Sequence, residues 1–97
     1  MRVISRKTLK DFAEKEPAAK AAPKAWYAES RKADWANAAD VKATYASASI
    51  LKNGRIVFNI CGNTYRLVAW INYRYRTIYI RFVGTHKEYD KIDAERV

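Results

Sequence analysis

The stretch of sequence that decides the fold is RIVFNICGNTYRLVAWIN, residues 55–72. Apolar residues alternate in it with polar ones, which is the period of two expected of a β-strand that faces a core on one side. Gly62-Asn63 in its middle has the chemistry of a two-residue hairpin turn. The stretch therefore predicts two antiparallel strands, Arg55–Cys61 and Thr64–Asn72.

A third strand is expected at Thr77–Gly84, after a turn at Tyr73–Arg76. A tight first turn and a short second turn fix the register of the three strands. The predicted cross-strand pairs are Asn59–Arg66, Val57–Val68, Val68–Arg81 and Trp70–Tyr79.

This register sorts the side chains onto two faces of the sheet. The apolar face has to meet the rest of the core, and its members are Ile56, Phe58, Ile60, Leu67, Ala69, Ile71, Ile78, Ile80 and Phe82. The other face is polar and aromatic, and its members are Asn59, Arg66, Trp70, Asn72, Tyr79 and Arg81. Two guanidinium groups among aromatic rings make a phosphate cradle with stacking surfaces for bases. Alternatively, the arginines only solvate the open face of a half-covered sheet.

The first half of the chain has the pattern of helices. Arg2–Ile4 is a candidate opening strand, and Ser5 is a candidate N-cap for a helix that stops at Glu16-Pro17. A second helix is expected over Ala18–Ala33, with Pro23 either at its start or at a kink.

Asn37 is expected to cap a third helix that reaches about Thr44, and residues 86–92 are expected to form a short C-terminal helix or turn. The whole pattern predicts an α+β fold in a single domain, residues 1–97. N-terminal helices pack on an antiparallel β-sheet meander that is followed by the short C-terminal helix.

The net charge of +9 on this short chain favours a polyanionic partner. No acidic residue occurs between Asp40 and Glu88. The basic residues of that interval are Lys42, Lys52, Arg55, Arg66, Arg74, Arg76, Arg81 and Lys87. A solubilising surface is the alternative, but an acid-free interval interleaved with tyrosine and tryptophan favours nucleic acid.

Several classes of protein are excluded by absent patterns. No apolar run is long enough to span a membrane, and the basic N-terminus lacks the apolar region of a signal peptide. Cys61 is the single cysteine, which fits a reducing cytoplasm. We therefore expect a cytoplasmic protein that engages no membrane. The sequence has no His and Cys ligands at the spacing of a zinc site, no glycine-rich phosphate loop and no paired carboxylates. We therefore expect no metal and no cofactor.

His86 is the single histidine and lies just beyond the last predicted strand. An imidazole takes and gives protons near neutral pH, as acid–base cleavage requires. A structural or incidental histidine is the alternative. Glu88 and Asp90 beside it have the pattern of solvated helix charges or of a local orienting group.

Four segments of the chain carry a resemblance. The longest is SILKNGRIVFNI at 49–60 followed by GNTYRLV at 62–68, and the second is YIRFVGTHKEYD at 79–90. Shorter matches are VISRK at 3–7 and KADW at 32–35. In this order and spacing, which cover nearly the whole chain, they resemble the HigB family of RelE-like toxins.

The resemblance implies a RelE-like fold and an mRNA interferase that usually acts on mRNA in the ribosomal A site. It also implies a HigA-type antitoxin with a helix-turn-helix domain, in a complex that binds operator DNA. The catalytic residues that it implies are Arg66, His86 and Tyr89. The residues that it implies for binding RNA or phosphate are Lys52 and Arg55. The polar sheet face adds Asn59 and Arg81 as candidates for this role, and the acid-free basic interval adds Lys87. The archetypal branch has a lysine pair and a C-terminal arginine where this chain offers Lys52 and His86, so the assignment of general acid and general base stays open.

The predicted chemistry is attack by the 2′-hydroxyl of the RNA on the adjacent phosphorus, without a metal. Arg66, with Arg81 or Lys52, stabilises the charge on the phosphorane. His86 acts as acid or base, and Tyr89 assists it or stacks on a base. The alternatives are a non-catalytic RNA- or DNA-binding module and a ParE-type toxin directed at gyrase.

Overall fold

A computed structural model describes residues 1–19, 21–62 and 64–97. In these residues the chain forms one mixed sheet with the strand order β1-β5-β4-β3-β2. The strands are β1 Arg2–Ile4, β2 Ser49–Ile50, β3 Arg55–Ile60, β4 Tyr65–Asn72 and β5 Thr77–Thr85. Strands β2 to β5 run antiparallel to one another in sequence order, which confirms the predicted meander. The opening strand β1 instead pairs in parallel with β5.

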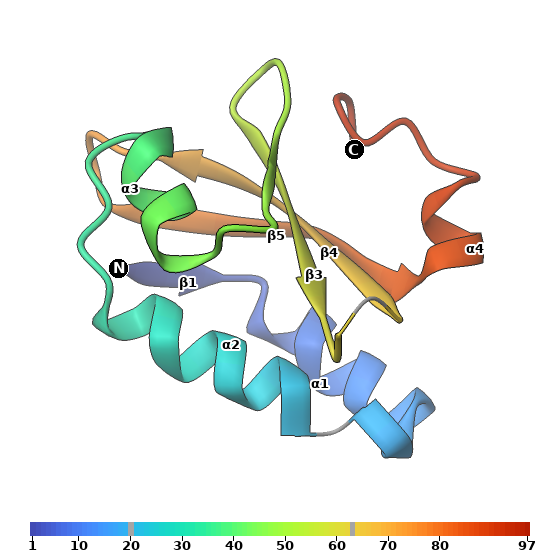
Figure 1. Ribbon diagram of the computed structural model, residues 1–97. Coiled ribbons are helices and arrows are strands. Elements are labelled where there is room, and N and C mark those ends of the chain that lie inside the picture. The colour runs from blue at the N-terminus through green and yellow to red at the C-terminus, as the bar shows by residue number, and fades with distance from the viewer. Residues whose placement is uncertain (20, 63) are drawn as a thin grey trace.

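The helices are α1 Arg6–Lys15, the 3₁₀ turn η1 Pro17–Ala19, α2 Ala21–Lys32, α3 Ala38–Thr44 and α4 His86–Tyr89. Figure 1 shows α1 and α2 along one side of the sheet, while the C-terminal segment that follows α4 lies on the other side. The expected α+β architecture with a short C-terminal helix is therefore confirmed.

The helix boundaries follow from local chemistry. Asn37 caps α3, because its side-chain oxygen accepts a hydrogen bond from the Asp40 backbone N–H at 3.0 Å. Ser5 takes the N-cap position of α1 with a φ of 72°, but its side chain makes no capping bond. Pro23 lies in the first turn of α2, where its missing N–H leaves no helix bond unmade. The second helix is shorter than predicted, because η1 replaces its first residues, and Lys20 lies outside the described residues.

The core lies between the helices and one face of β3, β4 and β5. Phe58 is its centre, because Trp26 and Tyr45 meet its ring edge-on and Trp35 stacks on it at 6.2 Å. The buried side chains that the sheet adds are Ile56, Phe58, Ile60, Tyr65, Leu67, Ala69, Ile71, Ile78 and Ile80. This is the predicted apolar face without Phe82 and with Tyr65.

The predicted register is right for the first hairpin and partly wrong for the second. Asn59 pairs with Arg66 and Val57 with Val68, as expected from a tight turn, although Asn63 of that turn lies outside the described residues. In the second hairpin Trp70 pairs with Tyr79 as predicted, but Val68 pairs with Phe82 and not with Arg81.

A β-bulge causes this difference. The register shifts between Val68 and Ala69, so that Arg81 is the extra residue of β5. Beyond the bulge the alternation of β5 is reversed. Val83 therefore packs against the core in the place that was predicted for Phe82, and Phe82 lies across from Val68 on the opposite face.

Candidate functional site

The sheet face away from α1 and α2 carries half of the predicted site residues, namely Arg55, Asn59, Arg66 and Arg81. Its side chains form three cross-strand rows, which are Asn59–Arg66–Gly84, Val57–Val68–Phe82 and Arg55–Trp70–Tyr79. The first row lies at the end of the sheet that leads into α4, and the third lies toward the turn at residues 73–76. We call this surface the open face. It places a polar row, an apolar row and a row of cation and aromatic rings side by side.

Arg55 and Arg81 of the open face converge on one oxygen atom. The Nε and Nη2 atoms of Arg55 donate to the main-chain oxygen of Val97 at 3.1 and 2.7 Å, and Nε of Arg81 donates to the same oxygen at 3.2 Å. Asn53 donates to the main-chain oxygen of Glu95 at 3.4 Å, so the C-terminal segment lies against this face. Two guanidinium groups around one oxygen are the donor arrangement that binds a phosphate oxygen.

Arg66 and His86 belong to the same end of the sheet. Arg66 pairs across the strands with Gly84, and His86 begins α4 two residues later. Nη1 of Arg66 donates to the main-chain oxygen of Tyr65 at 3.3 Å, and the side chain is partly exposed. The register thus brings the predicted strand arginine and the predicted acid–base group to one edge of the open face.

The helix α4 presents His86 and Tyr89. His86 is well exposed, and its Nε2 lies 3.6 Å from a carboxylate oxygen of Asp90 one helical turn later. Such a carboxylate can orient the imidazole. Tyr89 lines a cavity of about 490 Å³ together with Leu51 and residues 92–95. An imidazole and a phenol therefore occupy the segment that leads from the sheet to the C-terminal residues.

A capping box fixes the start of α4. The Thr85 hydroxyl accepts a bond from the Glu88 N–H at 3.2 Å, and the Glu88 carboxylate accepts bonds from the Thr85 N–H at 3.0 Å and from its hydroxyl at 3.1 Å. These bonds, together with the Lys15 ammonium at 3.3 Å, lower the pKa of Glu88. Glu88 is thus part of the N-terminal cap of α4, and a role as an orienting group beside His86 stays a prediction. The Thr-x-x-Glu spacing is the signal that could have singled it out.

Gly84 is a second residue that the sequence analysis did not include in the site. A Cβ atom at this position would lie 2.8 Å from the ring of Phe82 and 3.1 Å from a carboxylate oxygen of Glu88. The missing side chain therefore lets α4 and Phe82 approach the strand directly across from Arg66. A glycine that interrupts a strand pattern is the sequence signal for such a close approach.

The other predicted site residues are Asn59, Lys52 and Lys87. Asn59 uses its side-chain amide to bond the main-chain oxygen of Ser47 at 3.1 Å, which holds the segment before β2. Lys52 lies exposed between β2 and β3, and Lys87 lies exposed on α4. Their predicted role in binding RNA stays a prediction.

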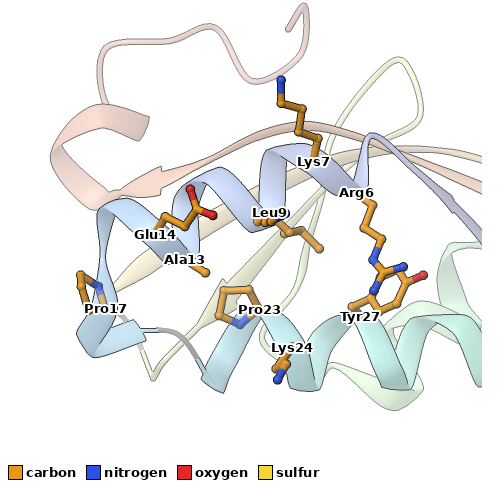
Figure 2. Close-up of a pocket in the computed structure, with 10 residues that line it drawn as sticks. Arg6, Lys7, Leu9, Ala13, Glu14, Pro17, Pro23, Lys24 and Tyr27 are labelled. Atoms are coloured by element: carbon orange, nitrogen blue, oxygen red, sulfur yellow. The ribbon is translucent and has the colours of Figure 1, made fainter.

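A larger cavity, of about 880 Å³, lies between α1 and α2 on the other side of the molecule. Figure 2 shows its walls, where Leu9 and Pro23 approach each other and the Arg6 guanidinium lies over the ring of Tyr27, 4.7 Å from its centroid. Its rim adds Lys7 and Lys24. None of the predicted catalytic residues lines it.

No three His, Cys, Asp or Glu side chains within residues 1–19, 21–62 and 64–97 come together in the way that a metal site requires. No helix in these ranges has the length and apolar character needed to cross a membrane.

Comparison of the sequence with known proteins gives matches that cover most of the chain. Residues 19–92 match the family model "HigB_toxin, RelE-like toxic component of a toxin-antitoxin system". The "mRNA interferase toxin HigB" of Escherichia coli (strain K12) is 38% identical over 96 residues, which cover 97% of this chain and 92% of that protein. The "mRNA interferase HigB" of Shigella flexneri has the same identity and coverage. The protein of that name from Escherichia coli O6:H1 is 24% identical over 95% of this chain and 91% of its own length.

Proposed function

Because this chain belongs to the HigB family of RelE-like toxins, we propose that it is the toxic component of a toxin–antitoxin system and acts as an mRNA interferase. The relatives that carry this activity in their names align with nearly the whole chain. The alternatives of a non-catalytic binding module and of a gyrase-directed toxin find no support in these comparisons.

The observation that carries the proposal is the convergence of Arg55 and Arg81 on one oxygen atom of the open face. These donors come from two strands that are not neighbours, so only the folded sheet can assemble them. Phosphate oxygens of RNA have the charge and the lone pairs to occupy such a cradle more strongly than a backbone oxygen does. Asn59 of this face and the exposed Lys52 and Lys87 are further contacts for the RNA backbone in this proposal.

The proposed cleavage uses the 2′-hydroxyl of the substrate. A base removes its proton, the oxygen attacks the adjacent phosphorus, and the bond from phosphorus to the 5′-oxygen breaks as an acid protonates that oxygen. The products are a 2′,3′-cyclic phosphate and a 5′-hydroxyl. RNA itself holds this nucleophile next to phosphorus, so the protein has to supply proton transfer and charge stabilisation.

The open face offers side chains for both tasks. Arg66 stabilises the negative charge of the phosphorane with a guanidinium that is charged at any physiological pH. His86, with Asp90 at 3.6 Å from its Nε2, transfers a proton. Tyr89 of the same helix assists the transfer or stacks on a base. In this scheme the guanidinium groups provide the positive charge that a metal ion provides in other nucleases.

We further propose three specific binding partners for this chain. The first is mRNA in the A site of the ribosome, which the net charge of +9 suits. The second is a HigA-type antitoxin with a helix-turn-helix domain, and the third is the operator DNA that the complex of the two proteins binds. Action on translated mRNA implies that the protein works in the cytoplasm.

Expression of the chain alone tests the proposal. Growth and protein synthesis should stop, cellular mRNA should acquire new 5′-hydroxyl ends, and co-expression of the neighbouring reading frame should restore growth. An RNA-binding module would protect RNA and leave no new ends, and a gyrase-directed toxin would stop replication before translation. Harmless expression of the unmutated chain would remove the toxin assignment.

A further inference from the structure

We propose that Trp70 and Tyr79 form the platform of a second nucleotide subsite, on which a base of single-stranded RNA stacks away from the nucleotide that is cut. The inference rests on the proposed function, because it takes RNA as the molecule that lies on the open face. It assigns a task to two aromatic residues that neither the core nor the proposed chemistry requires.

The two rings form a stacked pair on the surface of the sheet. Trp70 and Tyr79 face each other across β4 and β5, with ring centroids 4.9 Å apart and planes inclined by 30°. Both are partly exposed, and the hydrophobic core cluster on the other face does not contain them. Partly exposed rings beside cationic side chains are the surface on which proteins stack the bases of single-stranded nucleic acids.

Gly54 holds the indole of Trp70 in place. A Cβ atom on Gly54 would lie only 2.8 Å from Nε1 and 2.9 Å from Cδ1 of that indole, so the ring packs directly on the glycine backbone. Gly54 has a φ of +72°, and its carbonyl accepts a bond from the Ile71 N–H at 3.3 Å. The ring is therefore ordered before a ligand arrives, which lowers the entropic cost of binding.

The phosphate cradle adjoins this platform. Arg55 is the cross-strand partner of Trp70, and Arg81 follows Tyr79 by two residues in β5. The oxygen of Val97 that both arginines hold therefore marks the place where an RNA phosphate oxygen would lie when it displaces the C-terminal segment. A phosphate at this point leaves its nucleotide within reach of the rings.

The platform is separate from the cleavage centre. Trp70 lies four residues after Arg66 in β4, which corresponds to about 13 Å at the usual rise of a strand. A base held there belongs to a nucleotide other than the one whose 2′-hydroxyl reacts. The subsite therefore contributes to affinity and to the choice of RNA segment, and not to bond breaking.

Tryptophan fluorescence tests this subsite directly. The chain has three tryptophans, and two of them, Trp26 and Trp35, are buried with 2% and 3% exposure. A change on binding therefore reports on Trp70. The probe is a 2′-O-methyl RNA oligonucleotide, which cannot be cut by its own 2′-oxygen. The control is an oligonucleotide of the same length and backbone in which every nucleotide lacks its base.

We expect the base-bearing oligonucleotide to quench the fluorescence and to bind more tightly than the abasic one. Trp70→Phe should remove the quenching but keep most of the affinity. Trp70→Ala should weaken binding of the base-bearing oligonucleotide on the order of tenfold and leave the abasic one unchanged. Tyr75→Ala, which removes an exposed ring outside the open face, should change neither.

Equal affinities of the two oligonucleotides for the wild-type protein, with unchanged fluorescence, would overturn the subsite, and this comparison needs no variant to fold. An equal loss of affinity for both oligonucleotides in Trp70→Ala would show that the ring is only structural. RNA that is cut without quenching refutes the subsite and keeps the proposed function. Quenching by the oligonucleotide, without new 5′-hydroxyl ends in the mRNA of cells that express the chain, refutes the proposed function and keeps the subsite.

Discussion

The two faces of β3, β4 and β5 are built from alternate residues of the same strands, yet they have opposite compositions. On the helix-covered face Phe58 and Leu67 are buried together beneath α1, α2 and α3, and the side chains are hydrocarbon or aromatic. On the open face β4 presents Arg66 and Trp70, each of which is next along the strand to a residue of the helix-covered face. The difference separates stability from function at these positions, because a substitution of Phe58 should cost folding and a substitution of Arg66 should cost RNA chemistry. The open face also contains the buried Val57 and Val68, which belong to the stability of the fold.

The largest effect on folding is expected from Phe58→Ala. The loss of a fully buried ring that meets Trp26 and Tyr45 should lower the free energy of unfolding by about 3–5 kcal/mol. The matched control is Asn59→Ala on the other face of the same strand, which should cost about 1 kcal/mol, the worth of one hydrogen bond. Urea denaturation followed by circular dichroism measures both. Similar costs for the two variants would contradict the division between the faces.

Arg66→Ala should have the largest effect on activity. Loss of the guanidinium beside the developing phosphorane charge should lower the rate of RNA cleavage about 100- to 1,000-fold. The free energy of unfolding should stay within about 0.5 kcal/mol of the original, since the side chain lies outside the core. Binding of the antitoxin should persist. The cleavage rate of Arg66→Lys should lie between those of the original chain and Arg66→Ala, because lysine keeps the charge but not the fork of donors. Insoluble or unfolded Arg66→Ala protein would instead make Arg66 a structural residue.

Arg55→Ala and Arg81→Ala should change how RNA binding depends on salt. Each removed phosphate contact should reduce the slope of log K against log salt by about 0.7, the value for single strands. The control is Arg31→Ala, which removes the same charge from α2 on the helix side of the sheet and should leave the slope nearly unchanged. Titrations of an uncleavable oligonucleotide at several salt concentrations give the slopes. Equal changes in all three variants would mean that only net charge attracts RNA.

The smallest effect is expected from Glu88→Gln and appears only in the pH dependence of stability. The bonds from Thr85 and Lys15 make the pKa of Glu88 lower in the folded chain than in the unfolded one. The carboxylate therefore stabilises the fold above its unfolded pKa, and this contribution is lost as pH falls through the folded value. Because Glu88 is partly exposed, less than about 1 kcal/mol is at stake.

Thermal melting at neutral and at acidic pH measures this contribution. The original chain should lose more stability than Glu88→Gln as the pH falls, since the variant has no carboxylate to protonate. If the stability of the two proteins depends on pH in the same way, the negative charge of Glu88 does not contribute to the capping box.

The sequence predicts the open face well where a local rule applies. Alternation in residues 55–72 and the short turn at Gly62 are enough to place Asn59 across from Arg66 and to separate Phe58 from Asn59. The pair of Trp70 and Tyr79 follows from the second turn in the same way. Each of these features depends on neighbours along the chain and on the period of two.

The features that sequence misses depend on long-range contacts. A strict period of two continues through Arg81, so the bulge that moves Phe82 to the open face leaves no mark in the pattern. The parallel pairing of the short β1 with β5 is likewise set by tertiary packing. Residues 90–97 have no periodicity, and nothing local indicates that the oxygen of Val97 reaches Arg55 and Arg81.

The central claim is that the open face cuts RNA by means of the RNA's own 2′-hydroxyl, and one substrate tests it most directly. This is an RNA with a single 2′-deoxy nucleotide immediately upstream of a mapped cleavage site. The purified protein should bind it as well as ordinary RNA and leave that site uncut, both on ribosomes and, with EDTA present, in a ribosome-free reaction. The ordinary RNA should yield a 5′-hydroxyl and a 2′,3′-cyclic or 3′-phosphate. Undiminished cutting of the deoxy substrate, or a 5′-phosphate on the product, would contradict the mechanism and remove the role proposed for His86.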